Sequence, residues 1–190
     1  MKKSVKLITT ISALCLSVAL LAFGVYAATS STLTINSTVT FTSQDVEVLW
    51  EWSVQGGSLT TATTGSHQTE IEGAVDDESV NLGSISFVTN QGEAGKTITY
   101  TIKCTNTGGK SVSVTAPTAG LFAGDSNLNI AYTTNGAGTT WSSVTLDTTD
   151  AKSVTYEVTL TLLDTTVDIA TQTLAAAFVA SPAPTTPVQP

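Results

Sequence analysis

Apolar and polar side chains alternate with a period of two through most of this chain. In the stretch from Asp45 to Gln55 the polar Glu47, Glu51 and Ser53 share one face. The apolar residues of this stretch occupy the other face: Val46, Val48, Trp50, Trp52 and Val54. The same alternation recurs at two further sets of apolar positions: Ile98, Tyr100, Ile102 and Cys104, and Val154, Tyr156, Val158, Leu160 and Leu162. This pattern predicts β-strands with one buried face and one face in water.

Glycine- and asparagine-rich turns separate these stretches, and no segment keeps a helical period of apolar residues. Because Asn and Gly tolerate the positive φ of tight turns, residues 107–110 and 135–138 predict hairpins. The first would pair residues 97–105 with 111–115, and the second would pair 128–133 with 141–146. Further strands are predicted over residues 69–75, 79–88 and 171–179. About nine or ten strands with short turns predict an all-β fold, a β-sandwich or jelly roll.

The first 27 residues have the features of a signal peptide. A lysine-containing start is followed by an uncharged apolar run that ends in small residues, which predicts cleavage between Ala27 and Ala28. An uncleaved membrane anchor is the alternative, because the run is nearly long enough to span a bilayer. Residues 43–180 are then the sandwich domain, and residues 181–190, which are rich in proline, a disordered tail.

The composition of the mature chain narrows the choice of partners. Without residues 1–27 the chain keeps four lysines, no arginine and fifteen carboxylates, a formal charge of −11. Such a surface repels nucleic acid and anionic lipid, so neither is expected as a partner once the signal peptide is removed. Cys104 is the one mature cysteine and can form no disulfide within the chain. We expect a secreted protein at the cell surface or in an extracellular matrix.

The segment from residue 28 to residue 42 is an uncharged, Thr-rich candidate strand at the new N-terminus. One face carries Ser37 together with the apolar side chains of the segment: Leu33, Ile35, Val39 and Phe41. Such a strand either pairs within its own domain or completes the sheet of a neighbouring copy by donor-strand complementation. The sequence leaves both alternatives open.

Three features together resemble the TasA/camelysin family of exported Gram-positive proteins. They are the signal peptide ending at Ala27, the Thr-rich strand that follows, and the strand-turn stretch from Thr97 to Gly109. The resemblance implies a SipW-type signal peptide, a jelly roll, and polymerisation into biofilm-matrix fibres by passing an N-terminal strand to the next subunit. The expected partner is therefore the chain itself, in a head-to-tail homopolymer.

Candidate sites for chemistry are few. His67, the single histidine, lies in a polar segment predicted to be a loop, and no catalytic motif accompanies it, so no enzyme activity is expected. No cofactor is expected. Three consecutive acidic residues, Asp76, Asp77 and Glu78, are weak candidates for calcium, although a solvated acidic turn is the simpler interpretation. Trp50 and Trp52 could form a platform for sugar rings, although aliphatic neighbours on their face favour the core. The expected function is a fibre subunit; the alternative is a monomeric binding module for carbohydrate or calcium-dependent adhesion.

Overall fold

The computed structural model describes most of the chain after residue 30. The described residues are 31–56, 58–59, 64–69, 76–89, 97–118, 121–164, 169 and 171–184. The predicted signal peptide with its cleavage site at Ala27 and Ala28 lies outside them, as does the end of the tail after residue 184. Among the described residues all regular structure is β, and no helix there is long and apolar enough to cross a membrane.

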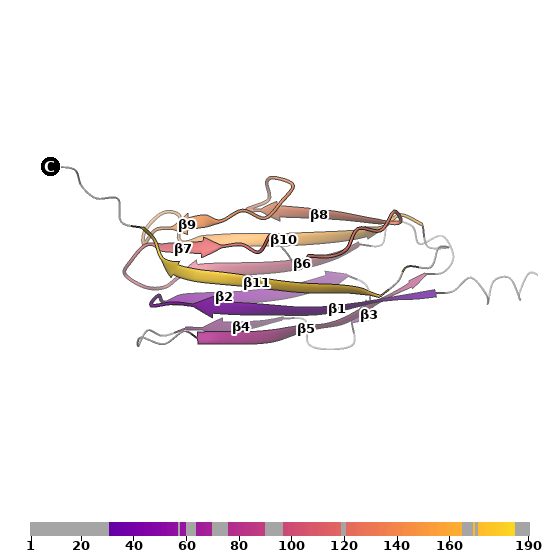
Figure 1. The fold of residues 1–190 in the computed structure, drawn as a ribbon, viewed down its shortest axis with the longest axis horizontal. Helices are drawn as coiled ribbons and strands as arrows, with labels where there is room; N and C mark the ends of the chain where they lie inside the picture. The colour runs from indigo at the N-terminus through magenta and orange to yellow at the C-terminus, as the bar shows by residue number, and fades with distance from the viewer. Residues whose placement is uncertain are drawn as a thin grey trace, which may run out of the picture.

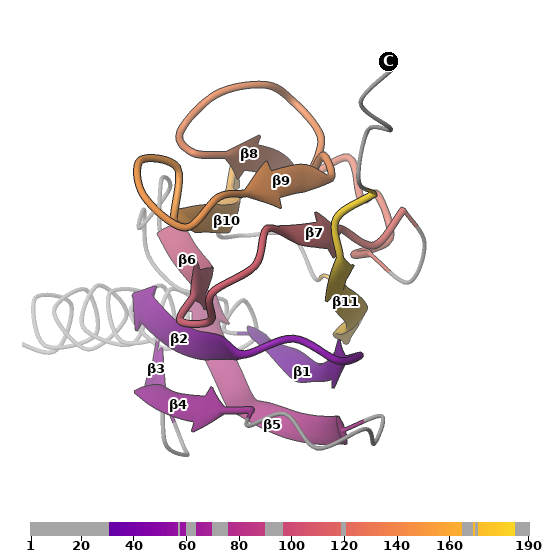
Figure 2. The ribbon, with the colours of Figure 1, turned by 90° about the vertical axis from the view of Figure 1, so that its left-hand side faces the viewer.

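Eleven strands form two sheets that pack face to face, so the predicted all-β sandwich is confirmed (Figure 2). The six-stranded first sheet has the order β3 (Ser58–Leu59), β5 (Asp76–Thr89), β1 (Ser31–Ser43), β11 (Gln172–Pro182), β7 (Val112–Thr115) and β9 (Val144–Leu146). The five-stranded second sheet has the order β4 (Thr64–Gln68), β2 (Val48–Gly56), β6 (Thr97–Asn106), β10 (Ser153–Leu162) and β8 (Leu128–Thr134).

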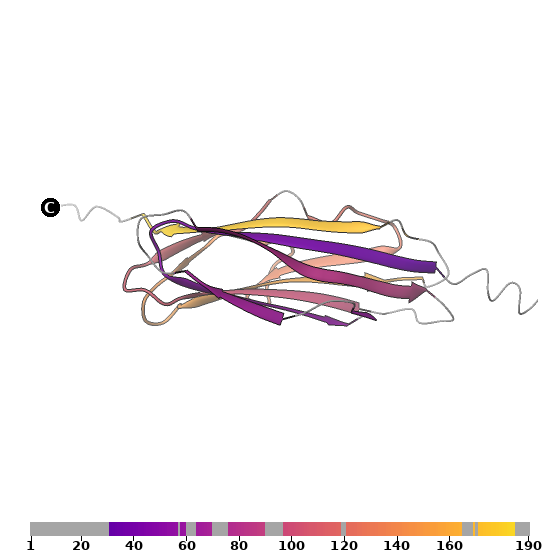
Figure 3. The ribbon, with the colours of Figure 1, turned by 90° about the horizontal axis from the view of Figure 1, so that it is seen from below.

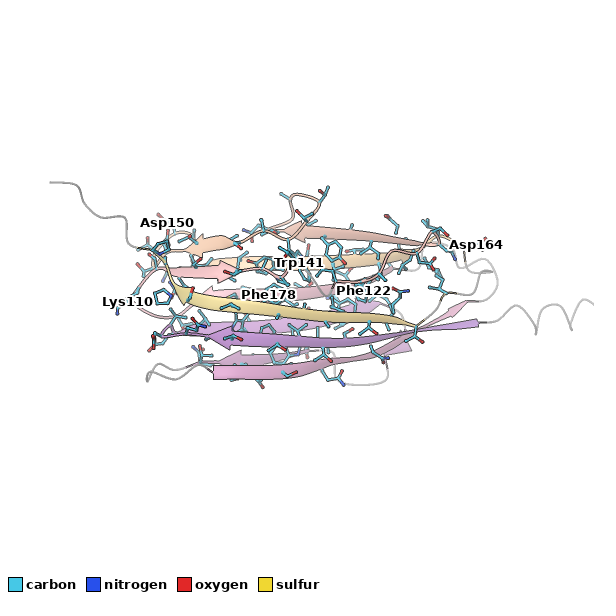
Figure 4. The ribbon with its side chains drawn as sticks, viewed as in Figure 1. Lys110, Phe122, Trp141, Asp150, Asp164 and Phe178 are labelled. Atoms are coloured by element: carbon cyan, nitrogen blue, oxygen red, sulfur yellow. The ribbon has the colours of Figure 1, made fainter. Side chains whose placement is uncertain are left out.

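The core lies between the two sheets, where the apolar face of each alternating strand meets its counterpart. Figure 4 shows Phe122, Trp141 and Phe178 in this layer, and all three are buried. Most residues that the alternation assigns to the core are likewise buried: Val46, Trp50, Tyr100, Ile102, Tyr156, Val158 and Leu160. Trp52 differs, because it is only partly buried and packs against the edge of the core.

Both predicted hairpins are wrong, although their turns exist. After β6 the chain crosses to the first sheet, where β7 pairs with β11 and β9 instead of with β6. The buried side chain of Asn106 holds this crossing turn: its amide donates to the carbonyl oxygen of Lys110 at 2.8 Å and its oxygen accepts from the amide of Gly108 at 3.1 Å. The turn therefore connects two sheets instead of two neighbouring strands.

The second turn, at Asn135 and Gly136, is tight, but a single β-bridge closes it and the strands before and after it do not pair with each other. Both residues have positive φ, 52° and 73°, as the Asn-Gly signal predicts. Thr134 and Ala137 form an isolated bridge, after which the chain crosses to β9 in the first sheet. Trp141 anchors this crossing, because its indole Nε1 donates to the carbonyl oxygen of Glu157 at 2.8 Å.

Three other segments differ from the sequence-based prediction. His67 lies in β4, not in a loop, and the acidic residues Asp76, Asp77 and Glu78 begin β5 and do not form a turn. Of the strand predicted over residues 69–75, only Thr69 is described, and it is not in a strand. β11 continues to Pro182, so the first residues of the predicted tail belong to the sheet.

β1 and β11 lie side by side and run in the same direction along the length of the sandwich (Figure 1). Figure 3 shows β11 in yellow, β1 in indigo and β5 in magenta as neighbours in one layer. At the end of the sandwich where β1 and β11 both finish, Figure 4 places Lys110 and Asp150. Asp164 lies at the opposite end, where β1 begins.

Candidate functional site

The segment predicted to assemble the protein is β1, and within this chain it occupies the middle of the first sheet. It pairs antiparallel with β5 from Ser31 to Ser43 and parallel with β11 from Ile35 to Ser43. Phe41, for example, lies between Glu78 of β5 and Phe178 of β11. We call the space between β5 and β11 that β1 fills the β1 groove.

The inner face of β1 packs into the core. Ile35, Val39 and Phe41 are at most 1% exposed, as expected for the side chains proposed to fill a groove. The side chain of Leu33 lies outside the described residues. Phe41 stacks on Trp50 of the second sheet with ring centroids 4.7 Å apart, an arrangement that strengthens the contact beyond simple burial.

Two serines alternate with these apolar residues and tie β1 to the second sheet. Ser37 Oγ donates a hydrogen bond to the hydroxyl oxygen of Tyr100 at 2.7 Å, and Trp50 Nε1 donates to Ser43 Oγ at 3.4 Å. Burial raises the pKa of Tyr100 to about 12, and the bond from Ser37 opposes this shift. Tyr100 is therefore neutral at physiological pH, and the contact is a buried hydrogen bond between neutral groups.

Sequence reasoning placed Ser37 on the buried face but did not find these partners. The alternation shows which face of a strand is buried, whereas Tyr100 and Trp50 belong to the other sheet, and their distance from β1 depends on how the sheets pack. A buried serine within an apolar face is nevertheless a usable signal, since a buried hydroxyl almost always has a hydrogen-bond partner.

The sugar-platform hypothesis does not hold for Trp50, which is fully buried. Trp52 borders a hollow of about 310 Å³ on the second sheet. Glu51 and Lys103 also line this hollow and form an ion pair at 3.0 Å. The indole of Trp52 lies over Gly65 of β4, where a Cβ would approach the ring to 2.4 Å.

The remaining ionisable candidates are His67 and the acidic residues at the start of β5. His67 Nδ1 lies 2.5 Å from Glu78 Oε2, a contact that joins β4 of one sheet to β5 of the other. Within the described part of the chain, no group of three or more His, Cys, Asp or Glu could hold a metal ion. The side chains of Asp76 and Asp77 lie outside that part.

Cys104 is a buried thiol near the end of β6. Burial raises its pKa far above the usual range, so the thiolate needed for nucleophilic chemistry does not form at neutral pH. Its role in the structure is to pack the core.

No protein-family model matches this sequence, and comparison with curated proteins gives no match either. The resemblance to the TasA/camelysin family therefore stays a sequence-based expectation.

Proposed function

We propose that this protein is a secreted structural subunit that polymerises into extracellular surface or matrix fibres by exchanging β1 between copies. The observation that carries the proposal is the position of β1: it is the first described strand of the chain, yet it fills the middle of a six-stranded sheet. A strand so placed, uncharged and close to the N-terminus that cleavage after Ala27 would create, is suited to leave its own groove and enter that of a neighbour. We propose no catalytic role.

Exchange between identical copies would keep the contacts that β1 makes in a single chain. The pairs with β5 and β11 and the stacking of Phe41 on Trp50 would form with the same partner residues in the next copy. An emptied groove would expose two unpaired strand edges, and such edges bind further strands. Only the link of residues 44–47 would need to change conformation.

The short link limits how successive copies can be arranged. Residues 44–47 span at most about 17 Å between Ser43 and Val48, and packed sheets lie about 10 Å apart. In one chain this link crosses from the first sheet to the second. After exchange the link would cross from the second sheet of one copy to the first sheet of the next. Neighbouring copies would therefore stack sheet against sheet, with the ends where β1 finishes lying next to each other.

The outer faces that such stacking would bring together are mostly uncharged. Thr38 of β1 and Ala175 and Ala177 of β11 are exposed on the first sheet. On the second sheet Thr99 and Thr159 face each other across β6 and β10, with hydroxyl oxygens 3.3 Å apart. The contact is heterologous, so it continues as a filament unless rotation closes it.

Electron microscopy of the purified mature chain tests this function. We expect filaments with an axial repeat of about 20 Å, which is two sheet spacings. Copies joined end to end would instead repeat at the length of the strands, roughly 36 Å or more. A chain that stays monomeric at high concentration and across pH, or that stops at a closed dimer, would contradict the proposal.

Substitutions on opposite faces of β1 provide a matched pair of variants. Ile35→Lys places a charge in the core and should abolish filaments, because burial of an unpaired ammonium costs several kcal/mol. Thr38→Ser removes only a methyl group from the exposed face three residues away and should keep both the fold and the filaments. Circular dichroism on both variants separates loss of assembly from loss of folding.

A monomeric extracellular binding module is the second candidate. The observation that favours it is the hollow beside Trp52, where an aromatic ring lies next to the polar pair Glu51 and Lys103. Binding of a soluble oligosaccharide that quenches tryptophan fluorescence in the wild-type chain, but not in Trp52→Ala, would support this candidate.

A further inference from the structure

The centre of β1 carries a buried polar contact between the two sheets. Ser37 is 1% exposed and Tyr100 is fully buried, and their oxygens are 2.7 Å apart. A buried hydroxyl that loses its partner weakens a structure far more than a surface hydroxyl does. The strand that fills the β1 groove must therefore present a hydrogen-bonding side chain at this point.

An independent irregularity in β5 lies at the same place. The register of β1 against β5 shifts between Ser37, which pairs with Gly83, and Thr38, which pairs with Asn81. Leu82 is thus an extra residue on β5, and its side chain is fully buried. A β-bulge of this kind fixes which residues face each other on the two strands.

A second polar contact lies six residues further along the same face of β1. Ser43 is 3% exposed and accepts a hydrogen bond from Trp50 Nε1 at 3.4 Å, longer and weaker than the bond of Ser37. We call the Ser37–Tyr100 and Ser43–Trp50 hydrogen bonds the register contacts.

We propose that the β1 groove selects the sequence and register of its occupant through the register contacts and the bulge at Leu82. The occupant is the β1 strand of a second copy, so the inference rests on the proposed function. The apolar pattern alone cannot make this selection, since a slip of two residues keeps the same face buried. Such a slip would place Ile35 or Val39 against the hydroxyl of Tyr100 and leave it unpaired.

Competition with synthetic peptides tests the selection in the full mature chain. A peptide of residues 31–43 should cap growing filaments and shorten them. A peptide with Ser37 and Val39 interchanged keeps the composition and the same set of inward-facing positions. We nevertheless expect that capping will require a concentration of this peptide about ten-fold higher. A Thr38→Ser peptide, which loses only a methyl group on the outer face, serves as the control and should cap like the native peptide. Equal capping by the Ser37/Val39 peptide would overturn the inference.

A change in the acceptor provides the complementary test. In filaments of a Tyr100→Phe chain the groove offers no hydroxyl to residue 37, so a Ser37→Ala peptide should cap as well as the native peptide. In wild-type filaments the Ser37→Ala peptide should be about ten-fold weaker. A preference for serine that survives Tyr100→Phe would contradict the assignment of Tyr100.

A double-mutant cycle in the unassembled chain separates failure of this inference from failure of the fibre proposal. If no filaments form, the proposed function fails, but the register contacts can still be measured within one chain. Ser37→Ala should raise the unfolding equilibrium constant about ten-fold, and adding Tyr100→Phe should recover most of that change. Strictly additive effects of the two substitutions would overturn the pairing of Ser37 with Tyr100.

Discussion

At the scale of single residues, the two tryptophans of β2 show how far the alternation predicts burial. Trp50 and Trp52 share one face of the strand, yet Trp50 is fully buried and Trp52 only partly. Trp50 stacks on Phe41 and pairs across the sheet with Cys104, and both of these partners are buried. Trp52 lies opposite Gly65 of β4, an edge strand, so its ring covers a residue without a side chain.

The two tryptophans should therefore differ in their contribution to stability. Trp50→Ala should cost about 3–5 kcal/mol of the free energy of unfolding, because it leaves a large cavity. Trp52→Ala should cost clearly less, since part of its ring already contacts solvent. Denaturant titration of both variants measures the difference, and Gln55→Ala on an exposed position of β2 is the control. Equal losses for the two tryptophans would contradict the burial described above.

The buried titratable residues predict a loss of stability at alkaline pH. Burial raises the pKa of Cys104 above its ordinary 9.0, and raises the pKa of Tyr100 from 10.0 to about 12. Burial also raises the pKa of Tyr156, with a further rise from neighbouring Cys104. All three are neutral when protonated, and the folded chain keeps these protons to higher pH than the unfolded chain. Their contribution is complete below pH 9 and decreases as pH rises above it.

We expect the free energy of unfolding to fall from about pH 9 upward, by up to about 1.4 kcal/mol per pH unit for each titrating group. In Cys104→Ala the fall should begin only near pH 10, where the tyrosines of the unfolded chain start to lose their protons. Urea titrations between pH 8 and pH 11 measure both curves. A wild-type stability that stays constant across this range would show that these groups are not buried as described.

At the scale of elements, the sequence predicts strands better than it predicts their neighbours. The strongly alternating segments that became β2, β6 and β10 were predicted because each has one buried and one exposed face. β4 was missed because Thr64–Gln68 contains no aliphatic side chain, and its strand character comes from pairing with β2. Residues 107–110 were correctly predicted as a turn, but a turn signal does not show whether the chain returns to the same sheet or crosses to the other.

The same limit applies to the candidate site. The buried face of β1 could be predicted, since Ile35, Val39 and Phe41 alternate with threonine and asparagine. Its central position between β5 and β11 could not, because both partners come later in the chain and the parallel pair with β11 joins residues more than a hundred positions apart. Long-range pairing of this kind depends on how the whole sandwich closes.

The link between β1 and β2 should control the balance between the closed and the exchanged chain. Asp45 has a φ of 52°, a left-handed conformation that proline cannot adopt and glycine adopts freely. Asp45→Pro should therefore disfavour the closed link and increase the assembled fraction, whereas Asp45→Gly should favour the closed monomer. Light scattering at matched protein concentration compares the two variants. Equal assembly of both, with circular dichroism showing both folded, would argue against a hinge at this link.

At the scale of the whole molecule, the proposed assembly must overcome the repulsion between acidic copies. Formal charge is −11 once residues 1–27 are removed, whereas β1 carries no charged residue. Added salt screens repulsion between surfaces, so filament growth by β1 exchange should become faster as ionic strength rises. The uncharged strand, buried on its inner face, keeps the assembling contact itself insensitive to salt.

Covalent trapping of β1 tests the central proposal most directly. Thr40 and Ser79 face each other across β1 and β5, so Thr40→Cys/Ser79→Cys can be joined by oxidation or a short thiol cross-linker. If β1 is exchanged, filaments of this variant will give a ladder of covalent multimers on a non-reducing denaturing gel. The control variant, Ser113→Cys/Ser181→Cys across β7 and β11, will run as a monomer, since neither of its strands is exchanged. A Thr40→Cys/Ser79→Cys variant that cross-links only within single chains, in assembled and unassembled material alike, would contradict strand exchange.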